Sequence, residues 1–389
     1  MATASVAGSP LDAHTESAIP FVFTGSGGEY FRIWIVNLLL TIVTFGVFSA
    51  WAKVRRLKYF YRNTQLAGNP FNYHGKPLAI LTGRIVALVL LAVWHFTDLQ
   101  SGSALAVLAI MLLVAPWLIV RALRFKLANS SWRGLRFGFT GSTRTAYLLL
   151  LAFISTVAMI CWFAYFPFKN LAVSGAGGML MALLIGLGAV LLLYLAVLPL
   201  GHYVFKRYQH SNSCFGTSTF HFDAGVKGFF KAYLVAIGFG FLSLIASGIV
   251  SGLFARRAAG LDPTTLSAQF LQFGLGLLIL YLFVVAVGPY VNARVQNLVW
   301  NHTELDAHRF ESTVSAKRLF QITLGNLVLT LLTLGLYKPF GVVRIVKYRV
   351  ESMHLLPATD LDSFVSMRDA AGAAIGQEAA ELFSIDIAL

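Results

Sequence analysis

The chain has 389 residues, of which 57% are hydrophobic and only 12% are charged. Soluble domains average about 45 to 50% apolar and about 25% charged residues, so this composition excludes an ordinary water-soluble enzyme. The formal net charge of +14 would also suit a nucleic-acid-binding protein. The positions of the basic residues, given below, instead favour a membrane topology and no nucleic-acid partner.

In chain order, the sequence divides into three parts. Residues 1–20 contain no Lys or Arg, so the basic region that opens a secretory signal peptide is missing, and we expect a disordered N-terminal segment. Residues 21–354 hold the long apolar runs and form the predicted integral membrane domain. Residues 355–389 are predicted to be an acidic C-terminal tail, which either docks on the basic face or stays loosely ordered with one short Ala-rich helix.

Eight apolar runs lie within the membrane domain. A transmembrane helix needs about 20 mainly apolar residues, and six runs meet this criterion: 78–96, 103–120, 146–168, 179–200, 232–254 and 268–290. Two further runs, 33–52 and 322–342, are interrupted by Asn, Thr and Gly. The predicted fold is an all-α polytopic membrane protein with about eight transmembrane segments, internal repeats and short β-strands in the cytoplasmic loops.

The first and last runs leave two alternatives open. Thr-Phe-Gly at 44–46 and Thr-Leu-Gly at 333–335 are sites where the chain could turn back within the bilayer, which is tolerated only where protein or water satisfies the backbone. Features that look cytoplasmic flank both runs on both sides, which favours this re-entrant version. Each run has about the 20 residues that a span needs, and for that reason we favour eight plain spans.

Lys and Arg are distributed unevenly between the loops. Most of the 30 lie in 53–84, 121–144, 206–231, 294–318 and 338–349, and the alternate connections are nearly bare except for Arg256 and Arg257. Because cytoplasmic loops carry an excess of Lys and Arg, the basic loops are predicted to face the cytoplasm. The six uninterrupted helices then form three hairpins that enter from and return to the cytoplasm.

An aromatic pair recurs in the polar loops. Phe-x-Phe or Phe-x-Tyr begins at Phe21, Phe71, Phe137 and Phe220, and a degraded fifth copy surrounds Phe310. Eight residues before the last four of these stand Asn63, Asn129, Asn212 and His302. Self-similarity at a fixed register reveals a building unit, and the alternating aromatics predict a helix end, a turn and a short strand in each loop.

The two interrupted runs also match each other at a constant spacing, and their shared polar residues form the first candidate site. The candidate polar pathway consists of Asn37, Thr41, Thr44, Asn326, Thr330 and Thr333. Residues four apart share a helical face, so two polar stripes could line a substrate path between symmetry-related segments. The alternative is that these side chains only hydrogen-bond neighbouring helices.

A second candidate set is basic. The candidate contacts to an anion or to lipid headgroups are Arg55, Lys58, Arg121, Arg124, Arg294, Arg344 and Lys347. Such residues near a membrane attract anionic headgroups of the cytoplasmic leaflet, so membrane lipids are the expected partners. The alternative is that they only set the topology.

Chemistry-bearing patterns are otherwise sparse. His202, His210, Cys214 and His221 crowd one loop, but their spacing matches no standard metal motif. We found no acidic residue inside an apolar run and no phosphate-binding loop, nucleophile elbow or HExxH motif. The sequence predicts no catalytic residue, no metal, no cofactor and no enzyme activity.

The N-terminal third carries a long composite motif. It comprises Phe21-x-Phe23-x-Gly25, Glu29-Tyr30-Phe31-x-Ile33-Trp34, Asn37-Leu38-Leu39, Thr44-x-Gly46, Trp51-Ala52-Lys53-Val54-Arg55 and Tyr59-Phe60. This motif resembles the YjgN family of bacterial inner-membrane proteins, and the resemblance covers about 21–354. It implies a multi-pass protein of the bacterial inner (cytoplasmic) membrane, and it implies no activity.

Two functions follow as hypotheses. Repeats and paired polar stripes favour a transporter or channel-like protein, whereas the basic loops favour a non-transporting scaffold or an anionic-lipid-binding protein. The substrate and the oligomeric state are left open. A polar cavity lined by Asn37 and Asn326 would favour transport, and a dry bundle with a broad basic face would favour the scaffold.

Overall fold

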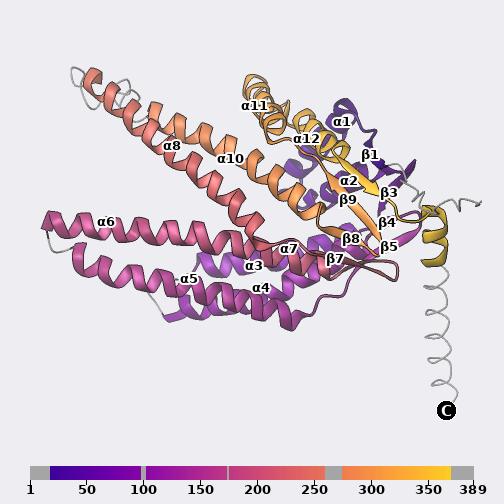
Figure 1. Ribbon diagram of the computed structural model, residues 1–389, viewed down its shortest axis with the longest axis horizontal. Helices are drawn as coiled ribbons and strands as arrows, with labels where there is room; N and C mark the ends of the chain where they lie inside the picture. Colours follow the sequence, from indigo (N-terminus) through magenta and orange to yellow (C-terminus); the bar gives the residue numbers. More distant parts are fainter. Residues whose placement is uncertain (1–17, 98–101, 173–174, 259–273, 369–389) are drawn as a thin grey trace, which may run out of the picture.

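In the computed structural model the chain combines long helices with a small β-barrel (Figure 1). The structure describes residues 18–97, 102–172, 175–258 and 274–368. The strands are β1 Ile19–Phe23, β2 Thr64–Leu66, β3 Asn69–Tyr73, β4 Ser130–Trp132, β5 Leu135–Phe139, β6 Ser213–Phe215, β7 Ser218–Phe222, β8 Thr303–Leu305, β9 His308–Ser312 and β10 Met353–Leu356. Neighbouring strands pair antiparallel, and β1 pairs with both β2 and β10, which closes the barrel.

Helices connect the strands. They are α1 Gly27–Val43, α2 Ser49–Arg62, α3 Pro77–His95, α4 Gly102–Ala128, α5 Thr143–Ala172, α6 Gly175–Leu192, the π-helical turn η1 Leu193–Val197, α7 Leu198–Ser211, α8 Val226–Ala258, α10 Leu275–Trp300, α11 Ala316–Leu332 and α12 Lys338–Glu351. A last helix spans 361–368. The pairs α5–α6 and α8–α10 extend away from the barrel as two long arms (Figure 1).

Tight turns join the strands of each hairpin. In the β2–β3 turn, Ala67 and Gly68 have φ values of 48° and 72°, and in the β4–β5 turn Arg133 and Gly134 have 50° and 87°. Two consecutive positive φ angles are typical of the two-residue turns that match the twist of a hairpin. Gly takes the second position because it adopts such angles without a steric cost.

At each of the first three β-hairpins, β2–β3, β4–β5 and β6–β7, an Asn joins the preceding helix to the hairpin in the same way. The side-chain amides of Asn63, Asn129 and Asn212 donate to the carbonyls of Tyr59, Phe125 and Tyr208, at 2.8, 2.7 and 2.7 Å. Their backbone carbonyls accept from Thr24, His74 and Thr140 of the adjacent strand ends, at 2.9, 2.8 and 2.9 Å. The recurring Asn thus ends a helix and ties it to the neighbouring strand.

The predicted all-α fold with about eight transmembrane segments is wrong. The strands expected in separate loops join into one closed barrel of ten strands. Among the described residues, three helices are long and apolar enough to cross a membrane: Pro77–His95, Thr143–Phe163 and Val226–Leu253. The barrel escaped prediction because each strand has only three to five residues and at least one of its two partner strands lies beyond a helical segment.

The first and last apolar runs do not form the continuous spans that we favoured. The chain reverses at residues 44–48, where Phe45 and Gly46 have φ values of 48° and 90°, and again at Leu334 and Gly335, with 49° and 95°. Each run therefore forms a helical hairpin, α1–α2 or α11–α12, whose two ends both lead to barrel strands. At the tips of the two hairpins, Phe45 is 99% exposed and Leu334 is 95% exposed.

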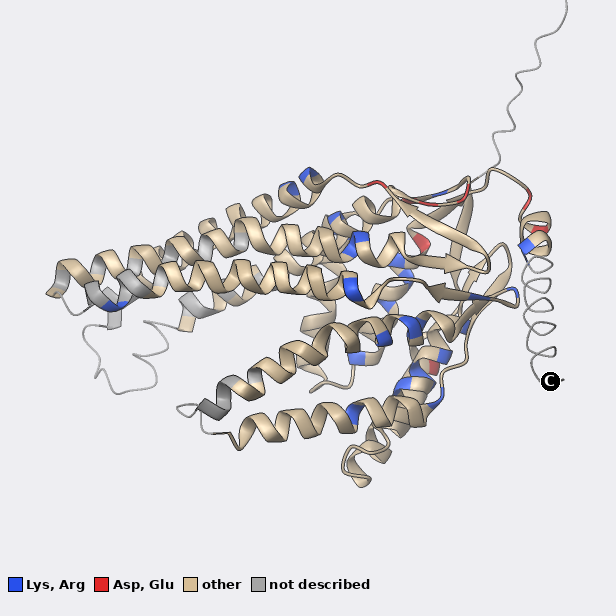
Figure 2. Cartoon of the chain, turned by 90° about the horizontal axis from the view of Figure 1, so that it is seen from below, with Lys and Arg blue, Asp and Glu red and all other residues tan. Residues whose placement is uncertain are grey.

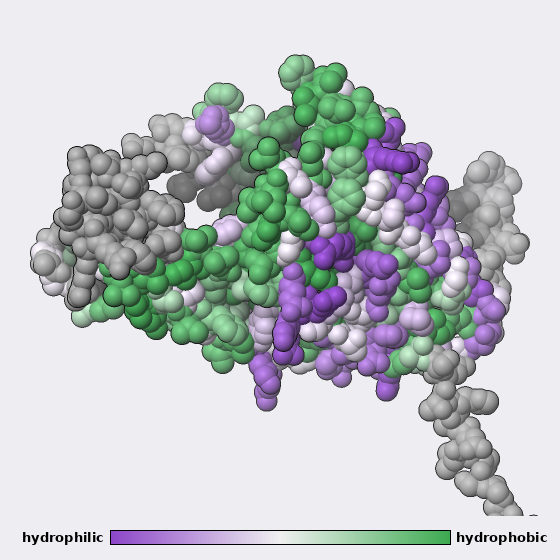
Figure 3. Space-filling model, turned by 90° about the horizontal axis from the view of Figure 1, so that it is seen from above, coloured by the Kyte–Doolittle hydropathy of each residue, from purple (hydrophilic) through white to green (hydrophobic). Residues whose placement is uncertain are grey.

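Charge and hydropathy divide the molecule into two ends. Lys and Arg gather on and beside the barrel, and the distal parts of the helical arms are almost free of them (Figure 2). Hydrophobic side chains cover the arms in the space-filling view (Figure 3). Exposed leucine, isoleucine and phenylalanine residues on α3, α5 and α8 would be unfavourable in water and suit contact with lipid.

Candidate functional site

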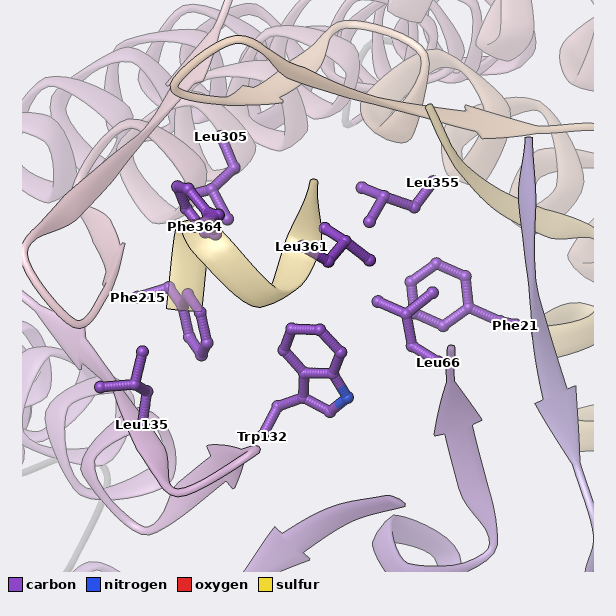
Figure 4. Close-up of a cluster of buried hydrophobic side chains, with 9 residues drawn as sticks. All are labelled: Phe21, Leu66, Trp132, Leu135, Phe215, Leu305, Leu355, Leu361 and Phe364. Carbon is purple, nitrogen blue, oxygen red and sulfur yellow. The ribbon is translucent and has the colours of Figure 1, made fainter. Parts of the chain in front are cut away.

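The helix 361–368, called the plug helix below, closes the end of the barrel that faces away from the arms (Figure 1). Asp360 caps it, since its carboxylate accepts from the backbone amide of Ser363 at 2.9 Å. Leu361 and Phe364 are 9% and 5% exposed and point among side chains contributed by seven strands (Figure 4). The barrel is therefore filled by a segment of its own chain.

Polar contacts hold the plug helix at the turns of two hairpins. Asp362 pairs with Arg133 in the β4–β5 turn. Arg368 pairs with Asp306 in the β8–β9 turn, with 2.6 Å between Nη2 and Oδ2. The ring of His308 meets that of Phe364 edge to face, with centroids 4.5 Å apart. Both sides of the mouth are thus tied to one helix.

A polar cavity of about 420 Å³, called the axial cavity below, lies where the helices meet the barrel. Its walls come from the barrel-proximal ends of α2, α4, α7, α10 and α12. Phe71, Phe137 and Phe220 of the barrel also line it, and the same three rings pack against the buried cluster around the plug helix. A layer of aromatic side chains therefore separates the cavity from the plug helix.

Three cations line the axial cavity, from three different helices: Lys126 of α4, Lys206 of α7 and Arg349 of α12. Burial, and then the charges of Lys126 and Arg349, lower the pKa of Lys206 below its usual value. These residues lie outside the three helices that are long and apolar enough to cross a membrane. No carboxylate occurs among the described lining residues, so the cavity concentrates uncompensated positive charge.

Glutamine side chains hold two of the cations in place. Arg349 Nε donates to Gln296 Oε1 at 2.6 Å, and Gln296 Nε2 donates back to the Arg349 carbonyl at 3.1 Å. Lys206 Nζ donates to Gln209 Oε1 at 3.3 Å. Burial and the charge of Lys206 lower the pKa of His210 to about 4, so its imidazole is neutral near pH 7. The chemistry available here is the binding of an anion.

An apolar groove of about 490 Å³ adjoins the axial cavity. It is lined by residues of α4, α5, α7 and α8, among them Ala152, Phe153 and Phe205. His202 lines both the groove and the axial cavity, and its Nδ1 lies 3.0 Å from the hydroxyl of Tyr233. The two spaces thus meet at His202, with the polar axial cavity on one side of it and the apolar groove on the other.

Comparison with known proteins gives the family. The sequence profile described as "Bacterial protein of unknown function (DUF898)" matches residues 18–382. The chain belongs to the DUF898 family. Inner membrane protein YjgN of Salmonella typhimurium (strain LT2) is 25% identical over 367 residues, which cover 90% of this chain and 90% of that protein. Inner membrane protein YjgN of Escherichia coli (strain K12) is 24% identical over 374 residues, with 88% and 89% covered. No solved structure matches.

These relatives confirm two predictions about this DUF898 protein. The resemblance to the YjgN family is confirmed. The bacterial inner membrane is confirmed as its location, and three apolar helices are consistent with it.

The predicted polar pathway lies in the two helical hairpins and lines neither described cavity. The hydroxyls of Thr41, Thr44 and Thr333 donate to carbonyls of their own helices, those of Asn37, Leu40 and Leu329, at 2.6 to 2.7 Å. The backbone carbonyl of Thr330 accepts from Gly335 at 2.7 Å. Asn326 donates to the Gly341 carbonyl at 3.0 Å, and Asn37 is buried with an unpaired side-chain oxygen.

The predicted basic contacts are all exposed on the outer surface: Arg55, Lys58, Arg121, Arg124, Arg294, Arg344 and Lys347. Several rest on neighbouring groups. Arg121 lies 4.9 Å above the ring of Trp117, Arg124 donates to the Gly141 carbonyl at 2.9 Å, and Lys347 is 3.9 Å from Glu351. These basic side chains lie on four different helices, α2, α4, α10 and α12, and do not form one cluster.

Sequence reasoning missed the cations of the axial cavity. A signal was present, because Lys126 and Gln209 stand three residues before Asn129 and Asn212, and Arg349 stands three before Ser352 at the last joint. Successive residues of a helix are turned by about 100°. A side chain three residues before the joint therefore faces away from the exposed arginine that stands eight residues before the joint. The repeat register, combined with helical geometry, thus separates residues that line the axial cavity from the arginines outside it, and Lys126 lines the cavity while remaining exposed.

Proposed function

We propose that this inner-membrane protein is a multi-pass, transporter-like or channel-like protein with no enzymatic role. The observation that carries the proposal is the axial cavity, a polar space surrounded by five helix ends and separated from the plug helix by a layer of aromatic rings. Polar, charged cavities are costly to maintain beside a membrane and commonly mark a substrate path. In this proposal the cavity is the substrate chamber and the plug helix closes its barrel side.

The same proposal places the barrel in the cytoplasm. The basic residues beside the barrel (Figure 2) support this orientation because positive loops stay on the cytoplasmic side. The equivalent Asn joints support a chain built from repeated units, each a helical hairpin closed by barrel strands. The terminal units are the short hairpins α1–α2 and α11–α12, whose apolar tips would enter the bilayer without crossing it.

Thiol accessibility tests the path. Gln209 of the axial cavity is changed to Cys in a chain whose Cys161 and Cys214 are Ser, and inside-out vesicles are treated with a membrane-impermeant maleimide. Phe364 is only 5% exposed, so Phe364→Asp would bury a carboxylate and should displace the plug helix. The labelling rate of the cysteine at position 209 should then rise. The matched control is Met367→Asp, whose side chain is 59% exposed. The path is refuted by labelling that neither variant changes.

Anionic-lipid binding without transport is the second candidate. The apolar groove beside the axial cavity favours it, since an acyl chain needs an apolar channel next to a charged headgroup site. A cavity cysteine that stays closed to aqueous reagents in every variant, in a protein that still binds anionic lipid, would favour this candidate.

A further inference from the structure

The three cations of the axial cavity have no acidic partner in the described part of the chain. Its four ion pairs all lie elsewhere, on the plug helix, between Glu304 and Arg309, and between Lys347 and Glu351. Like charges brought together from three helices repel one another, so this arrangement costs stability unless something offsets it. Such a cost is typical of a binding site.

We propose that the axial cavity is a binding site for a phosphate-like oxyanion, held by Lys126, Lys206 and Arg349. This deepens the proposed function by naming the substrate class. Arginine presents a planar fork to phosphate oxygens, and lysine adds a compact charge. A volume of about 420 Å³ falls in the range of about 300 to 1,000 Å³ that small-molecule sites occupy.

Arg349 is positioned for this use before any ligand arrives. Its hydrogen bonds to Gln296 engage Nε and the backbone carbonyl, so both Nη groups stay available. The phenol of Tyr61 also lies on the lining, whereas the hydroxyls of Ser130 and Ser213 already donate to the carbonyls of Lys126 and Gln209 at 2.8 and 2.7 Å. Preorganised donors cut the ordering cost of binding, and a lining without carboxylates avoids repelling the anion.

The adjoining apolar groove indicates two sources of the same chemistry. A free phosphate would occupy the axial cavity alone. A phospholipid would place its headgroup in the axial cavity and an acyl chain in the groove, passing His202 where the two spaces meet. The experiment below separates these sources.

Binding is measured directly, without transport, on the full-length protein in nanodiscs. Inorganic phosphate is titrated by calorimetry at constant ionic strength in phosphatidylcholine nanodiscs. In a parallel series, the melting temperature is compared between nanodiscs with and without phosphatidylglycerol. Lys206→Gln should weaken binding by about tenfold or more, since a hydrogen bond to a charged group contributes enough for that factor. Arg207→Gln is the matched control, because Arg207 is exposed on the same helix.

A second readout has the opposite sign. Without any anion, Lys206→Gln should raise the melting temperature, because it removes repulsion with Lys126 and Arg349. A variant that merely folds poorly would lower it. The combination of weaker binding and a more stable empty protein is specific to a charged ligand site.

The outcomes separate the alternatives. Phosphate binding that Lys206→Gln weakens supports the site with a free anion as ligand. Stabilisation by phosphatidylglycerol alone, lost in Lys206→Gln and in the groove-narrowing Ala152→Trp, supports the site with a lipid ligand. Equal effects of Lys206→Gln and Arg207→Gln, or no binding in either series, overturn the proposal. An anion that binds while the thiol path stays closed would refute transport and leave the site standing.

Discussion

At the scale of single residues, recurring positions in the sequence have a concrete structural cause. Asn63, Asn129 and Asn212 were found as a repeat, and each fixes a helix end through its side chain and a strand through its carbonyl. Only the structure supplies that reason, because the strand partner comes from a distant part of the chain. By contrast, Lys206 carries no repeated signature, and its meeting with Lys126 and Arg349 depends on the barrel's closure.

A backbone angle gives the first prediction. Gly134 has φ of 87° and open space around its Cβ position, so Gly134→Ala adds strain without a clash and should destabilise the protein by about 1–2 kcal/mol. Gly83 in α3 also has open space but no positive φ, so Gly83→Ala should cause no such loss. Thermal unfolding in detergent compares the two. Equal losses would show that the turn geometry is not the cause.

The buried imidazole of His210 gives a pH prediction. Its folded pKa of about 4 lies below the unfolded value of about 6.5. The neutral form is therefore favoured by folding, so this contribution to stability is present above pH 6.5 and is lost as the pH falls through about 4. Melting temperatures between pH 7 and 4 should fall less steeply in His210→Asn than in the wild type. His221→Asn, at an exposed position, should follow the wild type.

At the scale of elements, the plug helix shows that the packing position of a short amphipathic segment cannot be predicted from its local pattern. Leu361, Phe364 and Val365 stand at i, i+3 and i+4, a helical face, yet eight residues cannot form a stable helix alone. From its excess of acidic residues, we expected a tail that either docks on the basic face or stays loosely ordered. The strands were similarly predicted one by one, without the pairing that makes them a barrel. Local pattern finds such elements, and only long-range partners decide where they pack.

The plug helix should depend on its apolar side more than on its ion pairs. Phe364→Ala removes a buried ring, a change that costs about 3–5 kcal/mol in protein cores. Arg368→Gln breaks a pair whose side chains are about one-third exposed, which contributes about 0–1 kcal/mol. Hydrogen–deuterium exchange over 361–368 should rise strongly in the first variant and little in the second. A stronger effect of Arg368→Gln would mean that charge, not packing, closes the barrel.

At the scale of the whole molecule, the composition was enough to place the chain in a membrane, and its charges were enough to separate two ends. The number of spans was not predictable, because run length alone does not reveal a reversal. The 17 residues of α1 extend about 25 Å at 1.5 Å per residue, less than the hydrocarbon thickness of about 30 Å. In the proposed orientation, a hairpin of that length with both ends at the barrel would enter the bilayer and return.

This geometry predicts which positions water reaches. With Cys161 and Cys214 changed to Ser, a cysteine at Phe45 should resist an impermeant maleimide from either side if the tip ends within lipid as proposed. A cysteine at Ala67, in the β2–β3 turn, should react in inside-out vesicles and not in intact cells if the barrel faces the cytoplasm as proposed. Labelling of position 45 in intact cells would place the tip outside and refute the returning hairpin. Labelling of position 67 in intact cells would reverse the orientation of the whole protein, since the turn belongs to a barrel that includes strands from both ends of the described chain.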